Sequence, residues 1–348
     1  MSTDAGRITA RSLPRRIGEQ WFLLGMIAAV VLASFLPRFG AHGGPLHSEV
    51  TVDLGIALVF FLHGVNLPLE SLRRGVLAWR VHLLVQSLTY ILFPLLWLLF
   101  AVLFKGWIAP DLMLGFCYLA ALPSTISSSV AMTAVARGDV PVAIFNATLS
   151  SLLGIVLTPL LINWLGGAFL RGGGSAHGLN LGETMLNIAR MLLLPIVVGQ
   201  LLRPFVGEWF RRLKPYTNTV DRLVILFIVY AAFCNSVRSG LWQHNGVGLI
   251  ATTFAGDAAF LAAVLWLSTQ LARRLRFRRE DEIASVFCGS KKTLASGIPM
   301  ASLIFGAIPA LGVIVLPIML YHQLQLFVCS VLAHRYARRP GGFVRQAD

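Results

Sequence analysis

The stretch FCGSKKTLASGIPMASLIF, residues 287–305, lies in an apolar run that is long enough to form a membrane-spanning helix. Two lysines, Lys291 and Lys292, lie inside this run, and the helix-disfavouring Gly297 and Pro299 follow them. Each lysine at the centre of a bilayer costs roughly 2.5–3.5 kcal/mol on insertion scales. We therefore expect an interrupted helix whose two ammonium groups are hydrated, paired or close to an interface.

The composition of the whole chain is that of a protein with many membrane-spanning helices. Of its 348 residues, 56% are apolar and 13% are charged, and the mean hydropathy is +0.74. The apolar runs predict an all-α membrane protein with ten transmembrane helices, at residues 21–37, 50–66, 81–104, 112–136, 141–165, 183–202, 221–238, 247–271, 283–307 and 311–333. The four cysteines lack CxxC or Cys/His spacing, which predicts free thiols and no metal site.

The net charge of +14 comes from basic residues in the short gaps between apolar runs. We read these residues as topology signals that also contact anionic lipid, and we expect no nucleic-acid partner. With the N-terminus inside, 22 of the 29 Lys and Arg residues fall in inner segments and four fall in outer gaps. The terminal segments, residues 1–20 and 334–348, are therefore predicted to be cytoplasmic in a multi-pass protein of a bacterial-type inner membrane.

A second polar interruption, LPSTISSSVAMT at residues 122–133, is related to the first by a constant offset. The tripeptide TVD occurs at residues 51–53 and again 168 residues later, and the same offset carries Pro123 to Lys291. The fourth and ninth runs, which hold these interruptions, thus occupy corresponding positions in two halves of the chain.

Each half holds five runs, an odd number, so the second half must enter the membrane from the opposite side. This pattern predicts two inverted five-helix repeats, residues 21–165 and 183–333, with a binding site between two discontinuous helices. The alternative is two proline kinks that coincide by chance.

Two interrupted helices at mid-depth imply a polar cavity, because a membrane protein tolerates unwound backbone only where protein or water satisfies it. Helix N-termini there suit an anionic substrate, and short hydroxyl side chains add donors and acceptors. The candidate substrate-binding residues are Ser124, Thr125, Ser127, Ser128, Ser129, Ser290, Lys291, Lys292, Thr293, Ser296 and Gly297. For any single serine the alternative role is helix packing, since small residues let helices approach closely.

Asp257 lies about midway along the eighth run and is the carboxylate best placed to interact with the lysines. It could pair with either of them, or bind a coupling cation or a proton; a purely structural ion pair is the alternative. Further candidates for coupling or ion pairing are Thr89, His63, His322, Gln325 and Asn146, for each of which a structural role is the alternative. Asp53 and Asp221 are predicted at helix starts, where capping explains them.

Four stretches carry a resemblance to a known family: FFLHGVNLPLESL in the second run, LPSTISSSVAMTAVARGDVPVAIFNATLSSLLGIVLTPLL across the fourth and fifth, DEIASVFCGSKKTLASGIPMASLIF in the ninth, and PIMLYHQLQLFVCSVLAHRYARR at the end. The chain resembles the bile acid:sodium symporter superfamily over nearly its whole length, in particular its solute carrier family 10 member 7-like branch. The resemblance implies a core domain and a panel domain, with the fourth and ninth helices unwound and crossing. It also implies alternating access around organic anions such as sterol conjugates or small carboxylates.

The chain departs from the family's sodium-binding pattern at several positions. The family sequence P-G-G-T-A-S-N is replaced by the residues from Pro123 to Ser129, and the glutamate and glutamine of the ninth helix have no counterpart near Lys291. Fifth-helix hydroxyl ligands of the family fall near Ala143 and Ala147, and a third-helix glutamine falls near Thr89. The hypothesis that follows is that the ammonium of Lys291 or Lys292 takes the place of sodium.

The only cofactor that the sequence leaves undecided is a sodium ion near Ser128 and Ser129. The predicted function is a secondary transporter of a small organic anion, with sodium coupling undecided. No P-loop, nucleophile elbow or HExxH motif is present, so we predict no enzymatic activity. The alternatives are a non-transporting regulator of ion or calcium homeostasis on the same fold, and an intramembrane enzyme using Asp53, Asp221 or Asp257.

Overall fold

The computed structural model describes residues 21–66, 77–166, 181–240, 246–306 and 309–338, and for residues 181–189 it describes the backbone alone. These residues form helices and connecting turns, with no β-strand among them. The all-α prediction is therefore confirmed for the described part of the chain.

The described helices overlap the predicted runs, two of which are interrupted. In chain order the described helices are α2 (Trp21–Phe35), α3 (Pro37–Gly40), α4 (Ser48–Asn66), α6 (Trp79–Ser87), the π-helix η1 (Leu88–Leu92), α7 (Phe93–Leu103), α8 (Pro110–Ala121), α9 (Ser127–Val135), α10 (Val140–Leu161), the π-helix η2 (Ile162–Gly166), α12 (Leu181–Arg212), α13 (Lys214–Arg238), α14 (Gly246–Arg274), α15 (Arg279–Ser290), α16 (Gly297–Phe305) and α17 (Leu311–Arg338). Seven helical stretches are long and apolar enough to cross a membrane, and α2 and α8 are shorter apolar helices.

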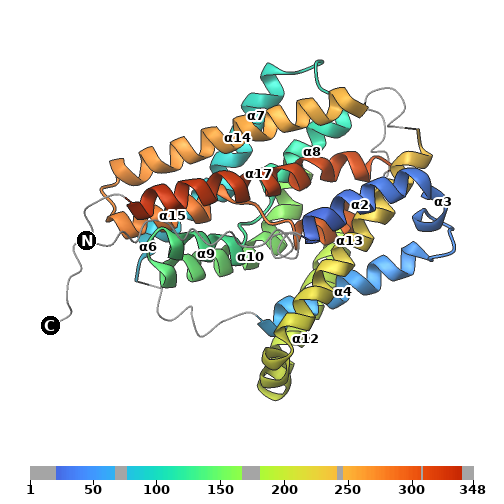
Figure 1. The fold of residues 1–348 in the computed structure, drawn as a ribbon, viewed down its shortest axis with the longest axis horizontal. Coiled ribbons are helices and arrows are strands. Elements are labelled where there is room, and N and C mark those ends of the chain that lie inside the picture. The colour runs from blue at the N-terminus through green and yellow to red at the C-terminus, as the bar shows by residue number, and fades with distance from the viewer. Residues whose placement is uncertain (1–20, 67–76, 167–180, 241–245, 307–308, 339–348) are drawn as a thin grey trace, which may run out of the picture.

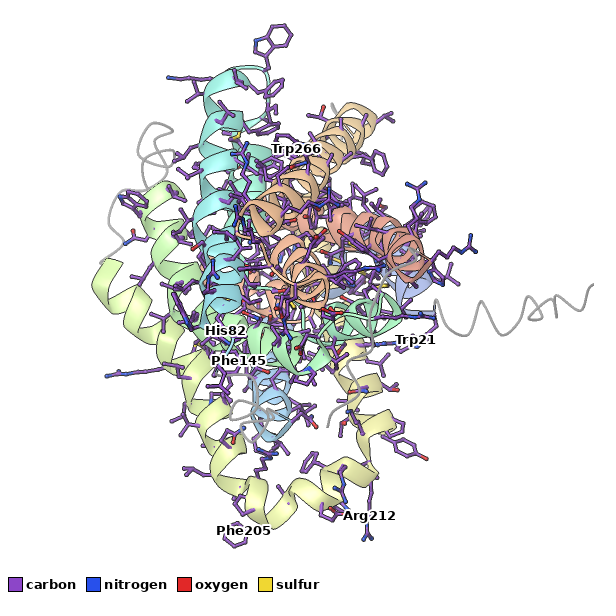
Figure 2. All side chains as sticks on the ribbon, turned by 90° about the vertical axis from the view of Figure 1, so that its left-hand side faces the viewer. Trp21, His82, Phe145, Phe205, Arg212 and Trp266 are labelled. Carbon is purple, nitrogen blue, oxygen red and sulfur yellow. The ribbon has the colours of Figure 1, made fainter. Side chains whose placement is uncertain are left out.

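The helices fall into two groups that lie side by side (Figure 1). In one group α4 packs on α12 and α2 packs on α13. In the other, α8 and α14 pack on α17, and α6, α9 and α10 pack around α15. At the far end of α12, Phe205 and Arg212 project away from the second group (Figure 2). Helices α8, α9 and α15 of the broken runs therefore lie within the second group, whereas α16 packs both on α17 and on α13, α4 and α12 of the first group.

The sixth and seventh runs are longer than predicted, which corrects one expectation. Helix α12 continues to Arg212 and α13 begins at Lys214, so polar residues that looked like a long gap are helical. Asp221 consequently lies in the interior of α13 and not at its start, where we expected a capping role. Its actual neighbour is His63 of α4, whose Nε2 lies 3.7 Å from an Asp221 carboxylate oxygen.

The fourth and ninth runs are both interrupted, as predicted. Helix α8 ends at Ala121, and its C-cap Leu122 is extended with ψ of 150° because a residue that precedes proline is disfavoured in the helical region. Helix α15 ends at Ser290, and the following Lys291 is likewise extended with ψ of 146°. We call residues 122–126 the first break and residues 291–296 the second break.

Candidate functional site

The two breaks are in direct contact with each other. The backbone N–H of Thr293 in the second break donates to the carbonyl of Pro123 in the first break at 3.0 Å. The two unwound segments, 168 residues apart in the sequence, thus form one backbone crossing.

Lys292 joins the second break to the C-terminal end of α8. Its side chain is completely buried, and its ammonium donates to the carbonyls of Ala120 at 2.9 Å and Leu122 at 2.7 Å. The last carbonyls of a helix have no partner within the helix and carry its negative dipole end. A cation at this position therefore satisfies carbonyls that the unwinding of α8 leaves free.

A third acceptor for Lys292 comes from the π-helix η1. There the N–H of Phe93 donates to the carbonyl of Leu88, five residues back, and this releases the carbonyl of Thr89 from helical pairing. Lys292 Nζ donates to that Thr89 carbonyl at 3.0 Å and lies 4.0 Å from the centroid of the Phe93 ring. All three donors of the ammonium are thereby used.

Hydroxyl groups of the first half satisfy carbonyls of the second in return. Ser124 Oγ donates to the carbonyl of Cys288 at 2.6 Å, and Ser129 Oγ donates to the carbonyl of Phe287 at 3.3 Å. These two serines are completely buried. Their hydrogen bonds hold the end of α15 against the first break, so their role in this structure is to support the crossing.

The frame around the second break also uses side chains that the sequence did not single out. Tyr321 donates to the carbonyl of Ser290 at 2.7 Å, and Tyr118 donates to the carbonyl of Gly297. Gln325, predicted as a coupling residue, accepts from the N–H of Lys292 and donates to its carbonyl, both at 2.8 Å. Tyr118 and Tyr321 lie inside apolar runs without a distinctive spacing, so tertiary contacts alone reveal these anchors.

The same hydroxyl pair occurs at the same relative position in the two halves: within the second break, and between the first break and the first turn of α9. Ser128 Oγ donates to Thr125 Oγ1 at 3.3 Å, and Ser296 Oγ donates to Thr293 Oγ1 at 3.2 Å. Adding 168 to either member of the first pair gives its counterpart in the second. Ser128 and Ser296 are half-buried, and the neighbouring Ser127 is exposed. Ser127, Ser128 and Ser296 are therefore the hydroxyl residues of the predicted site that are not buried, whereas Ser124, Ser129 and Lys292 donate to backbone carbonyls.

Lys291 differs from Lys292 in how its ammonium is held. The side chain is completely buried, and its ammonium donates one described hydrogen bond, to the carbonyl of Ser128 at 2.7 Å. Its Nζ also lies 5.6 Å from the centroid of the Phe287 ring. Two of its three N–H donors therefore have no described protein acceptor, next to the hydroxyl pair of the first break.

The residues around Ser128 and Ser129 do not fit a sodium ion. The Ser128 carbonyl already accepts from the ammonium of Lys291, and the Ser129 hydroxyl donates to the Phe287 carbonyl. A second cation beside that ammonium would be repelled by it. The carbonyls that Lys292 binds are occupied in the same way by a cation that belongs to the chain.

Asp257 is brought near the second break but is not paired with either lysine. It lies on α14, is completely buried, and neither carboxylate oxygen has a hydrogen-bond partner among the described residues. The expected ion pair with Lys291 or Lys292 is not formed, because both ammonium groups bind backbone carbonyls instead.

The remaining coupling candidates lie in different surroundings. His63 is on α4 in the first helix group, beside Asp221 and edge-on to Phe60. Asn146 accepts from Gln86 and donates to the carbonyl of Val142. His322 lies 3.0 Å from the Gln325 amide, through Nδ1, and Thr89 donates its hydroxyl to the carbonyl of Val85. Asp53 is exposed on α4, and no described contact joins it to Asp221 or Asp257.

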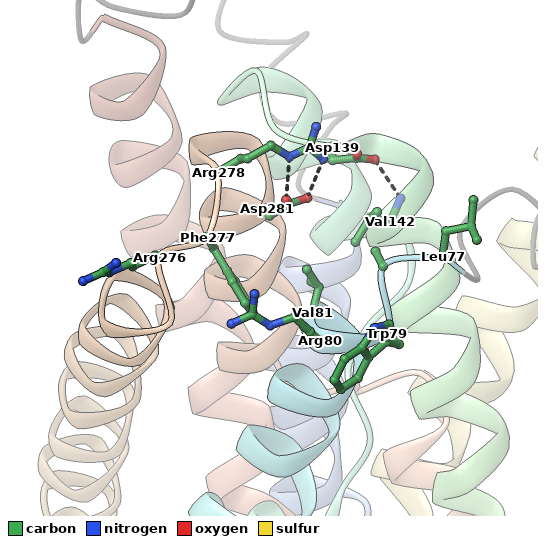
Figure 3. A pocket seen from close by; sticks show the side chains of 11 residues that line it. Leu77, Trp79, Arg80, Val81, Asp139, Val142, Arg276, Phe277, Arg278 and Asp281 are labelled. Carbon is green, nitrogen blue, oxygen red and sulfur yellow. Dashed lines mark hydrogen bonds and ion pairs between the residues drawn. The ribbon is translucent and has the colours of Figure 1, made fainter.

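A pocket of about 430 Å³ lies at the starts of α6, α10 and α15 (Figure 3), and none of the predicted site residues lines it. Its acidic groups are already used: Asp139 caps α10 by accepting from the N–H of Val142, and Asp281 accepts two hydrogen bonds from Arg278. The hydrogen bonding to Asp281 raises the pKa of the Arg278 guanidinium. We therefore interpret the charged residues of this pocket as support for three helix starts.

The chain is similar in sequence to a known protein family and to several known proteins. The chain matches the SBF-like CPA transporter family over residues 20–338. It is 46% identical to an uncharacterised protein of Pseudomonas aeruginosa, over 94% of this chain and 96% of that protein. It is 42% identical to YfeH of Escherichia coli, which is named as a candidate symporter, over 91% of this chain and 93% of that protein. It is 32% identical to sodium/bile acid cotransporter 7 of Danio rerio, over 91% of this chain and 93% of that protein.

The family match covers nearly all of the chain, and the similarity to each of these relatives extends over more than nine-tenths of both sequences. The apolar helices and the crossing of two interrupted ones are the features expected of a membrane transporter of this kind. The chain belongs to the bile acid:sodium symporter superfamily, in the branch of sodium/bile acid cotransporter 7, and is a transporter of that family.

Proposed function

We propose that the protein is a secondary transporter of a small organic anion that works by alternating access without a bound sodium ion. The substrate binds where the two breaks cross, in contact with Lys291 and the Thr125/Ser128 and Thr293/Ser296 hydroxyl pairs. The two halves of the chain act as inverted five-helix repeats in the inner membrane, with both termini in the cytoplasm.

The observation that carries this proposal is the pair of ammonium groups buried at the crossing. An ammonium with unused N–H donors attracts an anion, and the adjacent hydroxyls can donate to carboxylate oxygens. The free energy of this attraction is larger inside a protein than in water, because the effective dielectric constant is lower. Lys291 is the better substrate contact, since Lys292 has used all its donors on carbonyls.

The absence of a sodium requirement follows from what Lys292 does. Converging carbonyls from a helix end and a π-helix make a site that suits a small cation, and here a covalently attached ammonium fills it. A lysine cannot leave with the substrate, so it contributes positive charge without drawing energy from an ion gradient. The name of the Danio rerio relative includes sodium and bile acid, which makes bile acids reasonable first probes.

The test is ligand-dependent thermal stabilisation of the purified protein, screened over bile acids and small mono- and dicarboxylates. We expect at least one of these anions to raise the unfolding temperature by several degrees, equally in sodium and in potassium buffers, since a ligand at 100 times its Kd adds about 2.7 kcal/mol of stability. Lys291→Met should abolish the shift. Lys214→Met, at an exposed residue of α13, is the matched control and should retain it.

Three results would contradict the proposal in different ways. A shift that requires sodium would show that the lysines do not replace the ion. A shift that survives Lys291→Met would place the anion elsewhere in the protein, and no shift with any anion in the screen would reject this substrate class.

A further inference from the structure

Asp257 is a buried ionisable group that the proposed anion site does not use. It lies on the inward face of α14, with no exposed surface, and both carboxylate oxygens are without a hydrogen-bond partner among the described residues. A buried polar atom without a partner is uncommon in native proteins and calls for a functional or structural reason.

The wall beside Asp257 is aromatic. A Cβ added at the adjacent Gly256 would lie 2.4 Å from the Phe116 ring, so α14 passes very close to α8 here. The rings of Phe116 and Phe260 are stacked with centroids 5.7 Å apart, and Phe100 packs against both. The rings offer the carboxyl group no countercharge, and the donor nearest to it is the backbone N–H of Tyr321 on α17, which does not form a regular hydrogen bond with it.

Several ionisable groups on the elements around α14 donate to other partners, and Cys117 of α8 and Cys329 of α17 are buried thiols. Tyr321 of α17 lies next to Asp257, but its hydroxyl donates to the Ser290 carbonyl. The two ammonium groups of the second break donate to carbonyls, and Cys288 of α15 donates to the carbonyl of Ala143. Tyr90 of η1 and Tyr118 of α8 donate to the carbonyls of Ser150 and Gly297, and His322 contacts Gln325.

An ionised carboxylate with neither water nor a countercharge is strongly disfavoured, whereas the neutral acid is tolerated. In the conformation seen here Asp257 therefore holds a proton. It also lies beside Tyr321, which anchors the Ser290 carbonyl directly before Lys291. A change in charge at Asp257 would act on this anchor, and through it on the second break.

We propose that Asp257 is the proton-binding site that couples transport, so that the protein moves its organic anion together with a proton. A proton from the aqueous phase on one side binds a carboxylate oxygen of Asp257 when that group is hydrated. The neutral acid is then enclosed as in this structure, and it releases the proton to water on the other side. This inference rests on the proposed function and supplies its driving ion.

The first experiment detects the proton directly. The infrared spectrum of the purified protein near neutral pH should contain the carbonyl stretch of a protonated carboxylic acid. Asp257→Asn, a neutral isostere of the protonated side chain, should remove that band; Asp257→Ser serves the same purpose if the asparagine variant is poorly recovered. Glu208→Gln should leave the band in place, since Glu208 is exposed and paired with Arg211.

The second experiment tests the link to the breaks without needing a substrate. All four native cysteines are buried, so Ser127→Cys places a reactive thiol at the start of α9. The maleimide labelling rate of this thiol is divided by the rate of an exposed control thiol, Ser239→Cys, at the residue directly after α13. The ratio corrects for the intrinsic titration of thiols. We expect this ratio to change about threefold or more between about pH 6 and pH 8, and to become independent of pH when Asp257→Asn is added.

Three results would overturn the inference: an acid band that is absent or that survives Asp257→Asn, a labelling ratio that does not depend on pH, or a pH dependence that persists in the Asp257→Asn protein. None of these readouts involves anion binding. The thermal-shift result with Lys291→Met is therefore independent of these experiments. Failure of proton coupling can be distinguished from failure of the anion site.

Discussion

The two breaks face the same physical problem and meet it with different chemistry. Each interrupts an apolar helix among buried residues, and each includes the threonine of a Thr-x-x-Ser hydroxyl pair, Thr125/Ser128 or Thr293/Ser296. The first break is electrically neutral, whereas the second contains Lys291 and Lys292. The second break therefore supplies the positive charge at the crossing. Residues of the first half, in η1, α9 and the end of α8, supply the carbonyls that accept hydrogen bonds from the two ammonium groups.

This division separates two roles that the sequence presents as one. Lys292 donates to three carbonyls and acts as an internal cation that holds α8, η1 and the second break together. Lys291 donates to one carbonyl, and its two other N–H donors, which have no acceptor among the described residues, are the ones we propose for the anion. Adjacent lysines point to different partners because the extended backbone at Lys291 sends successive side chains to opposite sides.

The largest expected effect comes from removing the internal cation. Lys292→Met keeps an unbranched side chain but leaves the carbonyls of Thr89, Ala120 and Leu122 without a donor. We expect a loss of about 3 kcal/mol or more, because each unsatisfied buried group costs about 1–3 kcal/mol and relief of the buried charge offsets only part of this. The unfolding temperature of the purified variant measures it.

Two comparisons sharpen the Lys292 prediction. Lys291→Met removes one hydrogen bond and should cost only about 1 kcal/mol. In Lys292→Ala, ammonium or methylammonium salts should restore part of the unfolding temperature by entering the vacated carbonyl site. A Lys292→Met protein as stable as the unmodified one would show that these carbonyls do not need the ammonium.

A smaller effect distinguishes the packing of the two breaks. A Cβ at Gly154 of α10 would lie 2.6 Å from the ring of Pro123 in the first break, and a proline ring cannot rotate away. At Gly297, which follows the second break, the nearest atom is a terminal methyl of Leu122 at 3.1 Å. We expect Gly154→Ala to destabilise by about 1–3 kcal/mol and Gly297→Ala by clearly less, measured by the same thermal unfolding. Equal losses would mean that the first break is no more rigid than the second.

The smallest expected effect tests the equivalence of the hydroxyl pairs. Thr125→Val and Thr293→Val each remove the acceptor of one Ser–Thr hydrogen bond while keeping the shape of the side chain. We expect each to lower stability by about 0.5–1.5 kcal/mol, and the two losses to agree within error. Both variants should also weaken the thermal shift given by the stabilising anion. A loss confined to one of them would show that the pairs are not equivalent and that the anion contacts one break only.

Prediction from the sequence was most successful for the breaks themselves. Pro123, the clustered hydroxyls and the lysines are local signals, and an interrupted helix follows from them without tertiary information. Prediction failed at Asp221, because polar residues in the 203–222 region looked like a gap although α12 and α13 nearly meet there. Charged residues near a helix end and in a loop have the same composition, and only the backbone trace distinguishes them.

The sequence by itself determined that this is a helical membrane protein with two interrupted helices at corresponding positions, since apolar length and helix-breaking residues are local properties. Only the tertiary structure decided which polar groups hold distant backbone in place and which do not. Ser124, Ser129 and Lys292 donate to backbone atoms distant in the chain, whereas Lys291 and Asp257 keep hydrogen-bonding capacity that no described residue uses. The physical reason is that the satisfaction of a buried polar group depends on where its partners converge in space, and a sequence does not state that.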